Sequence, residues 1–223
     1  MKKLTTNKDL ENKKKNKLII ISVALFLLFI GIFISVAQSN KPDITPYLYA
    51  DHAAEYGNKN AKVTIVEFFD PACESCRAFY PLVKQQIKQY KGKVKLVARP
   101  VAFHKNVDQV VAALEASKLQ NKFWEALRVV FYHQSSWAIN HTADVNLVYP
   151  YLQGIGIDID KLKVDMKSQS VVDIMQKDAQ DAKVLRVLKT PTFFVNGQVL
   201  DQFGAEPFKA LIAQQVKLAY TKE

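Results

Sequence analysis

The chain has 223 residues, of which 49% are hydrophobic, and its formal net charge is +10 at pH 7. Seven lysines and two acidic residues give residues 1–17 a charge of +5, and the other half of the surplus is spread over the rest of the chain. No basic stripe interleaved with aromatic residues is present, which argues against a nucleic-acid partner. The size allows one large domain or a domain with appendages, and we expect no cofactor and no bound metal.

The basic tail of residues 1–17 precedes an uncharged apolar run, residues 18–37, which is twenty residues long. A helix of that length crosses the hydrocarbon layer of a membrane. By the positive-inside rule, the basic tail stays in the cytoplasm and everything after Ala37 is exported. A cleaved signal peptide is the alternative, because Ser35-Val36-Ala37 offers small residues to a peptidase. Both interpretations place the remainder outside the cytoplasm, in a bacterial envelope where a disulfide persists.

Residues 38–60 are polar and contain proline, so we expect a linker between the anchor and a domain at residues 61–223. The linker is either a free tether or a short segment packed on the edge of the domain. It is too short to form a separate dimerisation domain.

The domain opens with Val63–Phe69, a run of apolar and β-branched residues interrupted only by Glu67. Such a run is typical of a central strand that is covered on both faces. Apolar residues then recur at helical spacing to about Tyr90. The only two cysteines, Cys73 and Cys76, therefore lie in the first turn of that helix. Free backbone N–H groups and the helix dipole stabilise an anion there, so the Cys73 thiolate should form at a lower pH than that of a free cysteine.

A Cys-x-x-Cys pair can be a redox dithiol, half of a metal site or an inert disulfide loop. A zinc site needs a second cysteine pair or an H-x3–5-H partner, and the sequence has neither. The position after a buried strand favours redox chemistry, with Cys73 as nucleophile and Cys76 as resolving thiol. A copper or other metal chaperone remains the alternative from another functional class.

The remaining elements indicate an α/β domain with a large helical segment. Val94–Phe103 is expected to be a strand parallel to the first, by strand–helix–strand logic, and Pro100 should end or bend it. Residues from about 106 to 188 are predominantly helical in pattern, and this is too long for a simple crossover. A hairpin around Asn196-Gly197 should join Thr192–Val195 to Val199–Phe203, and an amphipathic helix over Glu206–Tyr220 closes the chain.

Aromatic residues gather in the helical segment, namely Phe123, Trp124, Phe131, Tyr132 and Trp137. Packing in the core is the ordinary explanation for such a cluster. The alternative is a peptide-binding groove beside the two cysteines.

Two stretches of the chain resemble a known family. V-E-F-F-D-P-A-C-E-S-C-R-A-F-Y-P, followed much later by K-T-P-T-F-F-V-N-G, is similar to the thioredoxin fold and, within it, to DsbA/BdbD-like thiol–disulfide oxidoreductases. The resemblance covers roughly Asn58 to the C-terminus and implies a thioredoxin fold with a helical insertion at about 106–188. It also implies that Pro191 is cis and lies against the cysteines, where the Thr190 backbone pairs with a bound peptide. Lys189 departs from the glycine that many relatives have before this dipeptide.

The resemblance also suggests roles for three acidic or polar residues. Glu67 stands where many thioredoxin-fold enzymes have an acidic residue that helps to move the proton of the buried cysteine. The ordinary alternative is that Glu67 faces an edge or pairs with a lysine. Glu74 and Ser75, between the cysteines, should tune the redox properties, because a carboxylate beside Cys73 opposes its ionisation. Glu74 would thereby make the protein a weaker oxidant than relatives that have Pro-His at these positions.

The expected function is that of an enzyme, a protein dithiol–disulfide oxidoreductase located outside the cytoplasm. It would exchange its Cys73–Cys76 disulfide with exported cysteine-containing proteins, most simply as an oxidase. A membrane redox partner, DsbB-like or DsbD-like, is implied by the resemblance, and residues 18–37 would contact the lipid bilayer. An isomerase or reductase kept reduced by a membrane donor is the alternative within the same class.

Overall fold

Strand β2 is the centre of a five-stranded sheet in the computed structural model, and all seven of its residues are buried. It pairs in parallel with β3 and antiparallel with β6, while β1 and β7 form the two edges. The parallel pairing of β2 with β3 follows the expectation from the sequence. The five strands in spatial order are β1 (Ala54–Gly57), β3 (Val94–Pro100), β2 (Val63–Phe69), β6 (Thr192–Val195) and β7 (Gln198–Val199).

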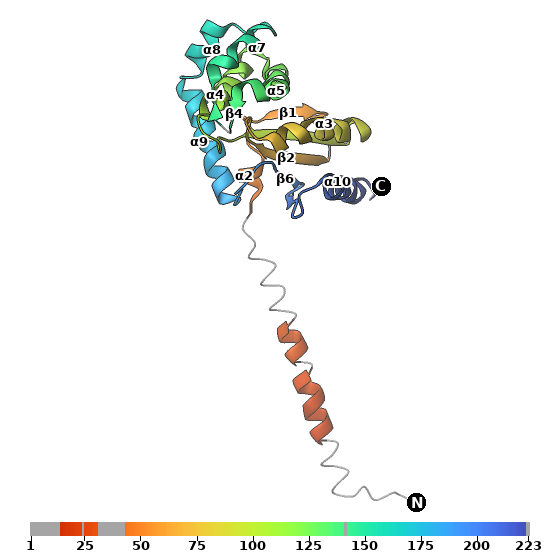
Figure 1. The fold of residues 1–223 in the computed structure, drawn as a ribbon. Helices are drawn as coiled ribbons and strands as arrows, with labels where there is room; N and C mark the ends of the chain where they lie inside the picture. Colours follow the sequence, from red (N-terminus) through yellow and green to blue (C-terminus); the bar gives the residue numbers. More distant parts are fainter. Residues whose placement is uncertain (1–13, 24, 31–42, 141, 222–223) are drawn as a thin grey trace, which may run out of the picture. The chain divides into compact units, whose positions relative to one another are not determined.

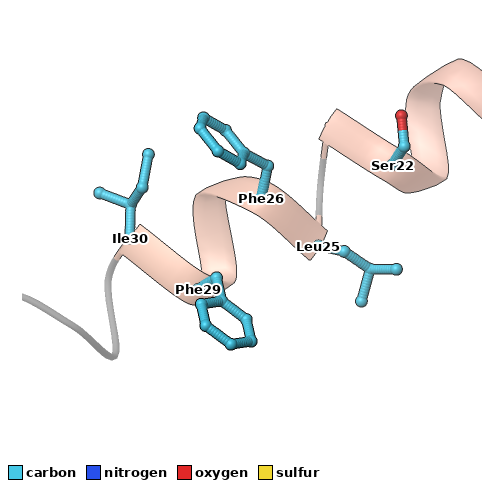
Figure 2. Close-up of a pocket in the computed structure, with 5 residues that line it drawn as sticks. All are labelled: Ser22, Leu25, Phe26, Phe29 and Ile30. Carbon is cyan, nitrogen blue, oxygen red and sulfur yellow. The ribbon is translucent and has the colours of Figure 1, made fainter.

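The structure describes residues 14–23, 25–30, 43–140 and 142–221, and the chain divides into two units, Met1–Asp43 and Ile44–Glu223. In the first unit, residues 14–23 and 25–30 are helical. Figure 2 shows Leu25, Phe26, Phe29 and Ile30 projecting from the second of these segments, and the Phe29 side chain is 77% exposed. Within the described ranges, no helix has both the length and the apolar character needed to cross a membrane.

Part of the predicted N-terminal organisation lies outside the described residues. The span expected at residues 18–37 includes residue 24 and residues 31–37, which the structure does not describe. The same holds for residues 1–13 of the basic tail and residues 38–42 of the linker. The membrane-spanning helix therefore stays a prediction from the sequence.

The two faces of the sheet are covered by different helices (Figure 1). One face packs against α3 (Glu74–Gln89) and α10 (Ala205–Tyr220) in a core that includes Ile65, Leu96 and Phe193. The other face packs against α2 (Thr45–Leu48) and α9 (Gln169–Val184). Successive residues of a strand point to opposite faces, so the continuous apolar sequence of β2 supplies both cores.

A helical insertion separates β3 from β6, and Figure 1 shows its helices α4, α5, α7 and α8 gathered beside one end of the sheet. Its core contains the fully buried Trp137 and is continuous with Phe69, Cys73 and Cys76. This confirms the thioredoxin-like α/β fold with an inserted helical segment. Besides α9, its elements are α4 (Asp108–Ser117), η1 (Lys118–Gln120), α5 (Phe123–Tyr132), α6 (Gln134–Trp137), β4 (Ala138–Ile139), β5 (Thr142–Ala143), η2 (Val145–Leu147), α7 (Tyr149–Gln153) and α8 (Ile159–Asp165).

Three boundaries differ from the sequence-based expectation. From Ile44 onward, the expected linker belongs to the domain, because α2 buries Leu48 and β1 pairs with β3. Four-residue elements are too short to show a hydrophobic period, which is why the sequence did not reveal them. The strand from Val94 ends at Pro100 rather than Phe103, and β7 is two residues long. The hairpin turn is as expected, with φ of 47° at Asn196 and 82° at Gly197.

Buried ion pairs join β3 to α9, and buried hydrogen bonds join it to α2. Arg99 has no exposed surface, and its guanidinium lies 2.7 Å from Asp178 and 2.6 Å from Asp181 on α9. It also donates hydrogen bonds to the carbonyls of Tyr47 and Leu48, at 3.0 and 3.1 Å. One side chain of β3 thus binds both α9 and α2, two segments that are distant from each other in sequence and that cover the second face of the sheet. Removing it leaves two buried carboxylates without their principal cation.

We predict that Arg99→Met lowers the free energy of unfolding by about 3 kcal/mol, because removing the central member of a buried ion-pair network is strongly destabilising. Among the residues that the structure describes, Asp178 then keeps only the His52 ring and Asp181 only Lys177 as ion-pair partners. Denaturant unfolding of the full chain, monitored by circular dichroism, measures the change. Lys209→Met is the matched control, because it breaks an exposed ion pair with Glu206 and should cost less than about 1 kcal/mol. Equal losses in the two variants would contradict this account of the network.

Candidate active site

The turn between β2 and α3 is fixed by Asp70, a fully buried residue directly after the strand. Its carboxylate accepts hydrogen bonds from the N–H groups of Ala72 at 2.7 Å, Phe103 at 2.7 Å and His104 at 2.8 Å. The His104 ring nitrogen Nδ1 lies 2.9 Å from the same carboxylate. Asp70 therefore ties the loop after β2 to the loop after β3, and it sets the direction in which α3 begins.

Cys73 caps the N-terminus of α3, and only 8% of its surface is exposed. Its N–H donates to the Asp70 carbonyl at 3.0 Å, and Sγ donates to the Thr190 carbonyl at 3.2 Å. The pKa of the thiol is lowered to about 5, chiefly by a hydrogen bond from the Cys76 side chain, which outweighs the opposing effect of burial. Hydrogen bonds from the Thr190 side chain and from the N–H groups of Cys76 and Ser75 lower it further. The pKa of Cys73 is thus shifted in the direction that the sequence predicts, with the Cys76 side chain as the largest cause and the N–H groups at the helix terminus as smaller ones.

Cys76 lies one turn further along α3 and has no exposed surface. Burial raises its pKa far above that of a free cysteine, and its hydrogen bond to Cys73 and the nearby Glu67 carboxylate raise it further. The two cysteines therefore differ in the direction expected for a nucleophile and a resolving thiol. Both are free thiols in this structure.

Glu67 is buried in the middle of β2, between Ala98 of β3 and Phe193 of β6. Its pKa is raised to about 8, first by burial and second by the negative charge that develops on Cys73. A carboxyl group with such a pKa holds a proton at neutral pH. The structure thus places Glu67 inside the sheet, and its influence on the pKa of Cys76 brings it near that thiol.

Thr190 and Pro191 lie directly before β6 and complete the site from the other side of β2. Their peptide bond is cis, and the Thr190 carbonyl contacts Sγ of Cys73. Glu74 and Ser75 are exposed in the first turn of α3. Their side chains extend into solvent beside the cysteines, so the suggested role in tuning the redox properties stays a prediction.

Gln134 is a contributor to the site that the sequence did not point to. It lies on α6 of the insertion and is buried, and its side-chain amide donates to the carbonyls of Pro71 at 2.7 Å and Cys73 at 3.0 Å. A glutamine after a helix gives no signal in a single sequence. Only the structure reveals its role, because the amide links the insertion to the Cys-x-x-Cys turn.

The family model described as Thioredoxin matches residues 50–214. The chain belongs to the thioredoxin family. Among relatives, the probable disulfide bond formation protein D of Bacillus anthracis is 30% identical over 202 residues, which is 84% of this chain and 91% of that protein. Family membership and this match make the chain a protein thiol–disulfide oxidoreductase of the DsbA/BdbD type.

Solved structures of the thioredoxin family have the same fold. BdbD from Bacillus subtilis in its oxidised form aligns with a TM-score of 0.66 at 24% identity, covering 74% of this chain and 94% of that one. The α-DsbA1 protein of Wolbachia pipientis aligns with a TM-score of 0.69 at 16% identity, covering 81% and 99%.

A second group of relatives is much longer than this chain. The Na⁺/H⁺ antiporter NhaA of Herminiimonas arsenicoxydans is 26% identical over 160 residues, which is 72% of this chain and 24% of the antiporter. The chain therefore spans about a quarter of the antiporter, and ion transport is not inferred for it.

We predict that Gln134→Ala raises the pKa of Cys73, because the turn that aims N–H groups at the sulfur loses its anchor. The variant should also lose about 1–3 kcal/mol of stability, because the Pro71 carbonyl is left buried without a partner. The pKa is read from the pH dependence of the alkylation rate.

The matched control is Gln215→Ala, which removes another buried glutamine whose amide bonds to Gln198 at 3.0 Å. That variant should lose stability without a change in the pKa of Cys73. A Cys73 pKa in Gln134→Ala that equals the wild-type value would show that Gln134 stabilises the fold without affecting the ionisation of Cys73.

Proposed function

We propose that this oxidoreductase works as an oxidase, which transfers its Cys73–Cys76 disulfide to exported proteins that contain cysteine pairs. The observation that supports this direction is the opposite shift of the two thiol pKa values. A thiol with a pKa near 5 is a good leaving group, and its stable thiolate favours the reduced form of the enzyme. A protein whose reduced form is stabilised tends to give its disulfide away.

In the first step, a substrate thiolate attacks Sγ of Cys73. The Cys73–Cys76 bond breaks, a mixed disulfide forms at Cys73, and Cys76 leaves with the electron pair. A thiolate at Cys76 is unfavourable, because burial raises its pKa. Glu67, which is protonated at neutral pH, supplies the proton that neutralises it.

In the second step, another thiolate of the substrate attacks the substrate sulfur of the mixed disulfide. The substrate disulfide forms and Cys73 leaves as a thiolate, which the hydrogen bonds at the start of α3 and from Thr190 stabilise. The reduced enzyme then has Cys73 as a thiolate and Cys76 as a thiol, Glu67 takes up a proton again, and the substrate has lost two electrons and two protons. The cycle then needs an oxidant, for which we propose a DsbB-like partner in the membrane.

Thr190 and Pro191 are the proposed binding residues for the substrate backbone. The Thr190 carbonyl contacts Sγ of Cys73 and belongs to the segment that leads into β6. A peptide that lies along this segment brings its own cysteine within reach of Cys73, as strand addition does in other complexes. In the mixed disulfide, the substrate takes the place of the contact between the thiol and Thr190.

We further propose that residues 18–37 anchor the protein in a bacterial cytoplasmic membrane, with residues 1–17 inside and the catalytic domain outside. Support comes from the uncharged sequence of this run and from the lysines that precede it. The exposed side chains of Leu25, Phe26, Phe29 and Ile30 would contact lipid (Figure 2).

The proposal is tested with the oxidised full-length chain in detergent and a reduced, unfolded model protein that has two cysteines. Each equivalent of enzyme should convert one substrate dithiol to a disulfide. In the reverse direction, reduced Cys76→Ala mixed with the oxidised model protein should accumulate a mixed disulfide at Cys73, because the resolving thiol is missing, and Cys73→Ala should form none. In glutathione buffers, the reduction potential should lie well above the thioredoxin value of about −270 mV. A value near thioredoxin would assign the protein to the reductases instead.

A further inference from the structure

A pocket of about 330 Å³ lies between α3 and α5, and none of its lining residues takes part in the disulfide exchange proposed above. Its lining is formed by Arg77 and Tyr80 from α3, and by Arg128, Phe131 and Tyr132 from α5. The thioredoxin part of the domain therefore supplies one wall, and the helical insertion supplies the other.

Hydrogen bonds connect both walls of the pocket to the backbone of the reactive cysteine. Arg77 follows Cys73 by four residues and donates its N–H to the Cys73 carbonyl at 3.1 Å, so the two residues lie one helical turn apart on the same face of α3. On the other wall, Tyr132 precedes Gln134 by two residues, and Gln134 also donates to the Cys73 carbonyl, at 3.0 Å. Both walls are thus tied to the backbone of Cys73.

Aromatic rings form a firm base for the pocket. The rings of Tyr80 and Phe131 are 5.3 Å apart between centroids, and Phe131 is 5.7 Å from Phe69 at the end of β2. Phe131 is only 3% exposed, whereas Tyr132 is 76% exposed at the rim. A side chain that enters the pocket can therefore pack its methylene groups against rings that the core holds in place.

The rim carries positive charge that the protein does not neutralise by a direct ion pair. Arg77 and Arg128 are both exposed, and neither forms a salt bridge within the part of the chain that the structure describes. Glu74 and Glu125 stand three residues before them on the same helices, yet neither carboxylate pairs with its arginine. Two planar guanidinium groups beside one pocket favour a carboxylate, which each of them can bind by two parallel hydrogen bonds.

We propose that Arg77 and Arg128 bind an aspartate or glutamate side chain that lies close to the reacting cysteine of the substrate polypeptide. The pocket then determines substrate specificity: it selects cysteines with an acidic neighbour. The inference rests on the proposed reaction with polypeptide thiols and names the class of polypeptide that reacts fastest. An acidic occupant is favoured over an apolar one, because an apolar side chain would leave the two arginines without a counter-charge.

The test measures the rate at which the oxidised full-length chain oxidises two dithiol peptides, which differ only in having Glu or Gln beside the first cysteine. Acid quenching and chromatography follow the peptide disulfide. The Glu peptide should react about three- to fivefold faster at low salt, as for an exposed ion pair, and this ratio should approach one at high salt. Arg128→Gln should lower the ratio toward one, because the Glu peptide loses one of its two cationic partners.

Lys183→Gln is the matched control, because it removes one exposed charge on α9 that does not line the pocket, and it should keep the wild-type ratio. Equal rates for the two peptides in the wild-type protein would overturn the inference and leave the proposed oxidase function intact. Failure to oxidise either peptide would count against the proposed function itself. A ratio that persists in Arg128→Gln and in Arg77→Gln would place the preference elsewhere on the surface.

Discussion

The first turn of α3 begins where β2 ends, and the hydrogen bonds of Asp70 and Gln134 hold that junction in place. The backbone N–H groups of Ser75 and Cys76 are thereby aimed at Sγ of Cys73. A thiolate is stable at this position chiefly because it accepts a hydrogen bond from the Cys76 side chain, and further because the oriented backbone N–H groups and the helix dipole favour an anion. The sheet, the insertion and the loop before β6 all contribute to this one small region.

The same junction shifts the pKa values of two chemically identical thiols in opposite directions. Cys73 sits at the end of the helix and ionises near pH 5, whereas Cys76, one turn into the buried core, resists ionisation. Above about pH 9 the lowered pKa of Cys73 stabilises the reduced enzyme fully, compared with an enzyme that has an ordinary thiol there, and this advantage shrinks as the pH falls from 9 toward 5. This advantage is lost as the pH falls through 5, because the thiol is then protonated in the folded protein as well. Glu67, with a pKa of about 8, can hold and release the proton that Cys76 exchanges.

The sequence predicted what depends on local patterns. The apolar run at Val63–Phe69, the Cys-x-x-Cys after it and the Asn196-Gly197 turn each carry a short-range signal, and the structure has each as expected. Resemblance to the thioredoxin family added the cis bond before Pro191 and the helical insertion. Contacts between segments that are distant in sequence could not be predicted from local patterns. Gln134 reaches Cys73 across 61 residues, and Arg99 reaches Asp181 across 82, without any pattern that marks either pair.

The proposed disulfide exchange depends most on the ionisation of Cys73, which can be measured directly. The ultraviolet absorbance of the thiolate is followed during a pH titration of the reduced full-length chain, with Cys73→Ser as the reference. We expect one transition with a midpoint near pH 5 that is absent from the variant. A midpoint near that of a free cysteine, about 8.5, would show that the junction does not stabilise the anion and would contradict the account.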